Sequence, residues 1–170
     1  DYTVILTYMS LMSAMSGMFC SFTGHNHLAV LCLALCGLFD TFDGKIARTK
    51  KNRTAREKRF GIQIDSLCDM VSFGVFPVVI CFHTGMNRPA GLVILAFYCL
   101  AGLIRLAFFN VLEEERQQET EEKMKYYHGL PITSVSVILP MIYISSALLG
   151  RYYLPILYAA MLITGFLFIL

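Results

Sequence analysis

Four aspartates stand at the two ends of the most polar stretch of this chain, and their spacing indicates that they act together. Asp40 and Asp43 are three residues apart at the end of one apolar segment. Asp65 and Asp69 are four residues apart at the start of the next one. Residues three or four apart share one face of a helix. If the two segments are antiparallel helices, all four carboxylates can meet in one cleft.

Carboxylates in such a cleft need compensating charge. Crowded acids disfavour joint ionisation, so either protons or cations must be present. Clustered carboxylate oxygens are the hard ligands that suit Mg²⁺ or Mn²⁺. Two such ions held side by side by carboxylates are a common device for phosphoryl chemistry. The four aspartates therefore predict a two-metal site.

Small residues and one arginine adjoin these acids. Gly44 and Ala47 follow Asp43, and Gly61 precedes Asp65 by one helical turn. They leave room for a bulky group against the backbone. Arg48 comes next in the chain and can clamp a phosphate, because its guanidinium matches phosphate oxygens in a fork geometry. Together these residues favour a substrate that contains a pyrophosphate.

The composition places these residues in a membrane protein. The 170 residues have a mean hydropathy of +0.61 and only 15% charged residues, against about 25% in soluble domains. The apolar residues fall in blocks of roughly 20, the length of helix that crosses a bilayer core. The first block contains four methionines and four serines, together with Ala14, and small residues such as Ser and Ala let membrane helices approach closely.

We expect a single all-α integral membrane domain over residues 1–170, a bundle of six transmembrane helices. The predicted spans are about 3–22, 28–47, 60–84, 90–111, 131–149 and 152–170. Pro89 and Pro131 suit helix starts.

The positive charges indicate the orientation of these spans. Eight of the fourteen basic residues lie between Lys45 and Arg59, mostly in a predicted loop over about 48–59. Such a run can bind nucleic acid, but between two spans it is more simply a cytoplasmic loop. We therefore expect a multi-pass cell membrane protein, no nucleic-acid partner, and both termini and the acids on the cytoplasmic side.

The residues around the acids also form a recognisable pattern. The order Asp40-x2-Asp43-Gly44-x2-Ala47-Arg48, followed by Gly61-x3-Asp65-x3-Asp69, resembles the signature of the CDP-alcohol phosphotransferase family. All eight signature residues are present, and the stretch 49–60 between the halves is longer than the family's usual gap. The resemblance implies a six-helix membrane enzyme, usually a homodimer. Such an enzyme transfers a substituted phosphate from a CDP-linked donor to an alcohol and releases CMP.

The resemblance also implies roles for the signature residues. Two divalent cations, Mg²⁺ or Mn²⁺, would be held by Asp40, Asp43, Asp65 and Asp69. Asp69 would also be the general base, with Asp65 beside it as the second catalytic acid. The cytidine-diphosphate pocket would be lined by Asp40, Asp43, Gly44, Ala47, Arg48, Gly61 and Asp65.

Three further segments narrow the choice of acceptor alcohol. Residues 65–77 (DSLCDMVSFGVFP), 105–111 (RLAFFNV) and 128–133 (HGLPIT) resemble the phosphatidylserine synthase branch of the family. Phe108 stands where that branch has a second arginine. The resemblance implies CDP-diacylglycerol and L-serine as substrates, membrane lipids as surroundings, and phosphatidylserine and CMP as products.

Three residues in these segments are candidates for binding the acceptor or the lipid phosphate. Arg105 lies inside an apolar span and should face the bundle rather than lipid. It can bind a substrate phosphate or the serine carboxylate, or instead pair with one of the aspartates. Asn110 can contact substrate or cap a helix, and His128 can belong to the site or to the membrane interface.

Two alternatives stay open at this point. Another acceptor of the same family, glycerol 3-phosphate or an inositol phosphate, would need additional basic residues facing the cleft, and few are present in the spans. A divalent-cation transporter would place its acids near the bilayer middle on discontinuous helices. The acids here cluster at one end of their spans instead.

Overall fold

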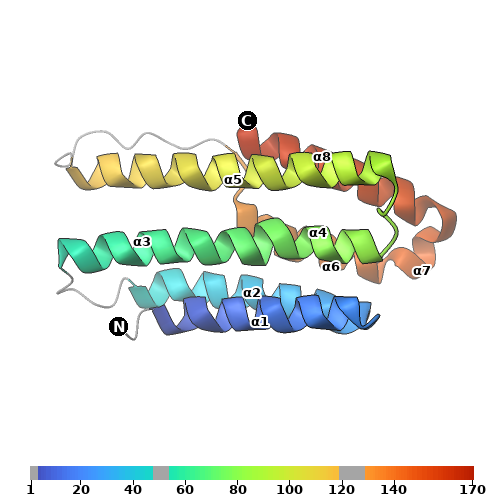
Figure 1. Ribbon diagram of the computed structural model, residues 1–170, viewed down its shortest axis with the longest axis horizontal. Helices are drawn as coiled ribbons and strands as arrows, with labels where there is room; N and C mark the ends of the chain where they lie inside the picture. Colours follow the sequence, from blue (N-terminus) through green and yellow to red (C-terminus); the bar gives the residue numbers. More distant parts are fainter. Residues whose placement is uncertain (1–3, 48–53, 119–128) are drawn as a thin grey trace.

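The computed structural model describes residues 4–47, 54–118 and 129–170, and these residues are helical without any strand (Figure 1). The longer helices are α1 (Ile5–Phe22), α2 (Asn26–Ala47), α3 (Ala55–Asp69), α4 (Phe76–His83), α5 (Pro89–Gln118), α6 (Val135–Ile144) and α8 (Tyr153–Ile169). Shorter pieces are the π-helix η2 (Met70–Val75), the 3-10 turns η3 (Ile132–Ser134) and η4 (Gly150–Tyr152), and α7 (Ser146–Leu149).

The helices lie lengthwise beside one another, so that the molecule is an elongated bundle (Figure 1). Helix α1 packs mainly on α2, and α5 packs mainly on α8. The rod formed by α3, η2 and α4 runs between these two pairs and contacts both α1 and α5. The two acid-bearing helices, α2 and α3, therefore lie in adjoining parts of the bundle.

Five helical stretches of the described residues are long and apolar enough to cross a membrane: Ile5–Phe22, Asn26–Asp43, Arg56–His83, Pro89–Glu113 and Ser146–Ile169. A sixth, Ile132–Ile144, is apolar but shorter. The prediction of an all-helical, multi-pass membrane bundle is confirmed. That residues 1–170 form a single domain stays a prediction.

The third helix begins earlier than the predicted span boundary near residue 60. Helix α3 begins at Ala55, because Thr54 and Glu57 form a capping box. The Glu57 amide donates to Thr54 Oγ1 at 3.2 Å, and the Thr54 amide donates to Glu57 Oε2 at 2.9 Å. Each bond satisfies a backbone N–H that has no partner inside the helix. The basic residues from Arg56 to Arg59 therefore belong to this helix and not to the predicted loop over 48–59.

The predicted fifth span over 131–149 is also interrupted. A 3-10 turn precedes α6, and the helix breaks at Ser145 before the short α7. The chain then turns at Gly150, whose φ of +49° suits a residue without a Cβ. The predicted fifth and sixth spans are thus joined by a compact turn that includes α7 and η4, rather than by a break at Gly150 and Arg151 alone.

One face of α1 is made of small buried residues: Thr7, Ser10, Ala14, Gly17 and Ser21. A Cβ on Gly17 would lie 2.7 Å from Cys32 Cβ and closer still to the ring of Phe76. Small residues therefore let α1 approach α2 and α4 closely, as expected of packed membrane helices.

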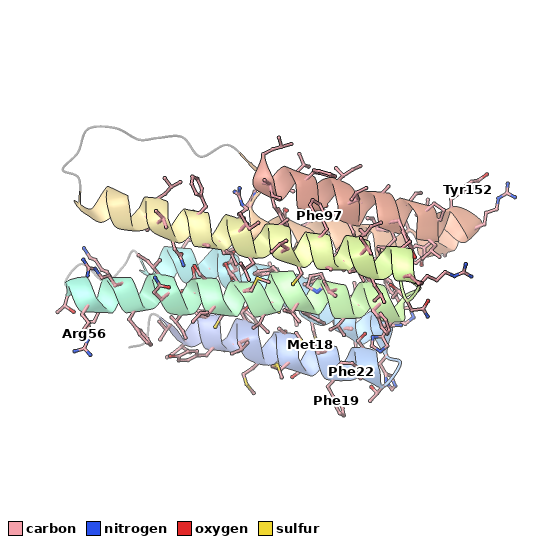
Figure 2. The ribbon with its side chains drawn as sticks, turned by 45° about the horizontal axis from the view of Figure 1, so that its top comes forward. Met18, Phe19, Phe22, Arg56, Phe97 and Tyr152 are labelled. Atoms are coloured by element: carbon pink, nitrogen blue, oxygen red, sulfur yellow. The ribbon has the colours of Figure 1, made fainter. Side chains whose placement is uncertain are left out.

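Large apolar side chains cover the outside of the bundle. Phe19 is 68% exposed and projects away from α1 (Figure 2), and Ile144 is 77% exposed. A surface of this kind suits contact with lipid, because the exposure of so large an apolar area to water is unfavourable. Arg56 and Tyr152 mark opposite ends of the bundle in the same view (Figure 2).

Candidate active site

Three of the four predicted aspartates converge between α2 and α3. Asp40 of α2 and Asp65 and Asp69 of α3 each present a carboxylate oxygen within 4.8 Å of those of the other two. All three side chains are partly buried. Within the ranges that the structure describes, no Lys or Arg side chain forms an ion pair with them. The negative charge of this cluster therefore has no compensating cation among those residues.

Asp43 adjoins this cluster but is held differently. Its side chain is 7% exposed, and its Oδ2 accepts a hydrogen bond from Thr7 Oγ1 of α1. It is close enough to Asp40, Asp65 and Asp69 for electrostatic repulsion among all four. Helix α1 thus contributes to the site through a hydroxyl that sequence reasoning did not single out. The available signal was Thr7 itself, a polar residue on the small-residue face of the first span.

The cluster fits a divalent cation by the chemistry of its donors. Three partly buried carboxylates that repel one another need protons or cations to coexist. Each would cost a few kcal/mol if it faced hydrocarbon as a bare anion. Their oxygens are the ligands that Mg²⁺ and Mn²⁺ prefer. The arrangement is therefore a candidate metal centre, with Asp43 available beside it.

The other signature residues are placed only in part. Gly61 lies on α3, one turn before Asp65, and is partly buried. Gly44 and Ala47 lie in the last turn of α2, but their surroundings are not described. Arg48 and His128 lie outside the described residues.

Arg105 contacts backbone carbonyls. The side chain is 8% exposed; its Nη2 donates to Gly129 O at 3.2 Å and its Nη1 donates to Phe168 O at 3.5 Å. These bonds join α5 to α8 and to the segment that precedes α6. The residue therefore has a structural role that neither of its predicted alternatives included, and its contact with substrate stays a prediction.

Asn110 lies beside the acid-bearing turn of α3. Its Oδ1 accepts a hydrogen bond of 2.6 Å from Ser66 Oγ. Ser66 follows Asp65 in the chain and is 9% exposed. Asn110 thus links α5 to the helix that bears Asp65 and Asp69.

The fold and the acid cluster define a helical membrane protein with a candidate metal centre between two spans. Comparison with protein families gives the class: the sequence profile described as CDP-alcohol phosphatidyltransferase matches residues 3–169. The chain belongs to this family.

Several curated proteins resemble the chain more specifically. The CDP-diacylglycerol–serine O-phosphatidyltransferase of Saccharomyces cerevisiae is 35% identical over 151 residues, which are 84% of this chain and 52% of that protein. The archaetidylserine synthase of Methanothermobacter thermautotrophicus is 30% identical over 141 residues, 81% of this chain and 56% of that protein. The CDP-diacylglycerol–serine O-phosphatidyltransferase of Mycobacterium leprae is 34% identical over 113 residues, 65% of this chain and 36% of that protein. This chain thus spans about half or less of the length of these relatives. No solved structure matches it significantly.

Proposed function

We propose that this chain is the catalytic region of a phosphatidylserine synthase. It transfers the phosphatidyl group of CDP-diacylglycerol to the hydroxyl of L-serine and releases CMP. The observation that carries the proposal is the convergence of Asp40, Asp65 and Asp69 in a chain of the CDP-alcohol phosphatidyltransferase family. The names of these relatives differ in the lipid, but both include serine. This favours serine over glycerol 3-phosphate or an inositol phosphate as the acceptor.

The same four aspartates are proposed to hold two divalent cations, Mg²⁺ or Mn²⁺. When bound, such ions neutralise a pyrophosphate and stabilise the charge that develops during phosphoryl transfer. The close oxygens of Asp40, Asp65 and Asp69, with the buried Asp43 next to them, support this assignment.

Asp69 is proposed as the general base. Its carboxylate takes the proton of the serine hydroxyl, directly or through a water molecule. The serine oxygen then bonds to the β-phosphorus of the donor as the bond from that phosphorus to the CMP oxygen breaks. CMP leaves with the electron pair of that bond.

The remaining signature residues are proposed to bind the donor. Gly44, Ala47 and Gly61 leave room for the cytidine diphosphate, and Arg48 binds its phosphates. The acceptor or the lipid phosphate is assigned to Arg105, Asn110 and His128.

The site is proposed to face the cytoplasm, in a homodimer surrounded by membrane lipids. Arg56, Lys58 and Arg59 are exposed on the first turns of α3, near the acid-bearing end of the bundle. Positive residues next to spans favour the cytoplasmic side.

An assay of the purified full-length protein with CDP-diacylglycerol and L-serine tests the proposal. We expect phosphatidylserine and CMP to form with Mg²⁺ or Mn²⁺, and the reaction to stop in EDTA. Equal activity in EDTA would exclude the metal role. Faster product formation with glycerol 3-phosphate than with serine would exclude serine as the natural acceptor.

The variant Asp69→Asn tests the general base. We expect the rate of phosphatidyl transfer to fall by about 10²–10⁴-fold, the usual contribution of general base catalysis. Glu57→Gln is the matched control, because it neutralises an acid of the same helix outside the cluster. A Gln at this position can still accept the capping-box hydrogen bond from the Thr54 amide. Full activity of Asp69→Asn would refute the assignment.

A further inference from the structure

A wide helical turn directly follows the acids of α3. In η2 the amide of Phe76 donates to Val71 O, five residues back, where an α-helix would bond four residues back. A π-turn of this kind holds one residue more than an α-turn, and such turns are frequent at functional sites. Removing it would change the rotation between the acid-bearing α3 and the core-packed α4 by about 100°.

Pro77 explains why an ordinary α-turn is unfavourable here. In an uninterrupted α-helix Phe73 O would accept a hydrogen bond from the amide of residue 77. A proline has no N–H, and its ring clashes with the carbonyl four residues before it. Phe73 is fully buried, so its carbonyl needs another donor, because a buried carbonyl without one costs free energy.

Tyr98 of α5 supplies that donor. Its hydroxyl donates to Phe73 O at 2.6 Å, and the side chain is fully buried. The ring packs against Phe168 of α8, with the two ring centroids 5.4 Å apart. The hydroxyl is therefore held in place from α5 and α8, outside the rod that contains the wide turn.

We propose that Tyr98 is a positioning residue for the acid cluster. Its bond to Phe73 O stabilises the wide turn that Pro77 requires. The geometry of this turn in turn fixes how Asp65 and Asp69 are oriented toward Asp40. This inference rests on the metal-binding role proposed above for the acids, and Tyr98 would act on them through Phe73 O.

The variant Tyr98→Phe tests the inference, because it keeps the ring and removes only the donor. We expect the dissociation constant of Mn²⁺, measured by electron paramagnetic resonance on the full-length protein, to rise roughly tenfold, as for other residues that orient metal ligands. Tyr158→Phe is the matched control on α8 and should leave the Mn²⁺ dissociation constant unchanged. Leu157→Ala is the control for lost stability, because it empties a fully buried site of α8 and should lower the melting temperature without changing Mn²⁺ binding.

A second variant keeps the test decisive if Tyr98→Phe does not fold. Pro77→Ala restores an amide that can donate to Phe73 O and so permits an α-turn. We expect weaker Mn²⁺ binding with an unchanged or higher melting temperature. Adding Tyr98→Phe to it should then change Mn²⁺ binding no further, since coupled residues are not additive.

Three results would overturn the inference: unchanged Mn²⁺ binding in Tyr98→Phe, an equal loss in Leu157→Ala, or no Mn²⁺ binding by the unaltered protein. Normal Mn²⁺ binding without phosphatidyl transfer to serine would instead contradict only the proposed function.

Discussion

At the scale of single residues, the candidate metal centre adjoins a hydroxyl of α1 as well as the acids of α2 and α3. Asp40, Asp65 and Asp69 lie together with partly buried side chains, and Asp43 is turned toward Thr7 of α1. A buried carboxylate is stabilised by each hydrogen bond that it accepts. Thr7 therefore supports the one aspartate that lies at the edge of the three-acid cluster.

The variant Thr7→Val tests that support while preserving the shape of the side chain. We expect the free energy of unfolding to fall by about 1–3 kcal/mol, because a buried acceptor of negative charge loses a donor. Mn²⁺ binding should weaken as well. Thermal unfolding and Mn²⁺ titration of the purified protein measure the two effects.

Thr164→Val is the matched control for this variant. Thr164 is also buried, at 4% exposure, but its hydroxyl donates to Ala160 O within α8. Its replacement should leave Mn²⁺ binding unchanged. Equal Mn²⁺ binding by Thr7→Val and the unaltered protein would show that Thr7 serves only the packing of α1.

At the scale of the elements, α1 packs closely against its neighbours because its buried face has no large side chains. The small residues of that face allow Phe76 and Cys32 to contact the backbone at Gly17. Close packing of this kind is a main source of association between membrane helices, since lipid provides no hydrophobic preference for one apolar neighbour over another.

The variant Gly17→Ala should therefore destabilise the bundle even though Ala is the better helix former. The added methyl would meet Cys32 Cβ at 2.7 Å, and overpacking typically costs about 1–3 kcal/mol. Ser16→Ala, on the exposed face of α1, is the control and should be nearly neutral. A melting temperature of Gly17→Ala equal to that of the unaltered protein would mean that α1 can move away from α2 and α4 without cost.

At the scale of the whole molecule, charge separates the two ends of the bundle. The basic first turns of α3 lie toward the acid-bearing end. The turn between α4 and α5, with Asn87 and Arg88, lies at the other end (Figure 1). The excess of Lys and Arg near the first end predicts that it stays in the cytoplasm.

Labelling of single cysteines in sealed membranes tests this orientation. All six native cysteines are free and can be replaced first. Exposed Arg56 and Asn87 are then changed singly to Cys. We expect a membrane-impermeant maleimide to reach Asn87→Cys from the non-cytoplasmic side, and Arg56→Cys only after permeabilisation. The reverse pattern would place the acid cluster on the other side of the membrane.

The sequence alone determined those features that depend on neighbouring residues. Runs of apolar residues determine membrane helices, and spacings of three and four residues place acids on one helix face. The capping box of Thr54 and Glu57 was equally readable, because all its atoms lie within one turn. The start of α3 was therefore predictable, although the expected boundary near residue 60 missed it.

Only the tertiary structure decided which distant side chains complete these local features. Thr7 is 36 residues from Asp43, and Tyr98 is 25 residues from the carbonyl of Phe73. Pro77 shows in the sequence that a helical bond must be missing, but not which helix provides the replacement donor. That choice depends on how the helices pack against one another, and in a bundle whose faces are nearly all apolar no short-range pattern specifies the neighbour.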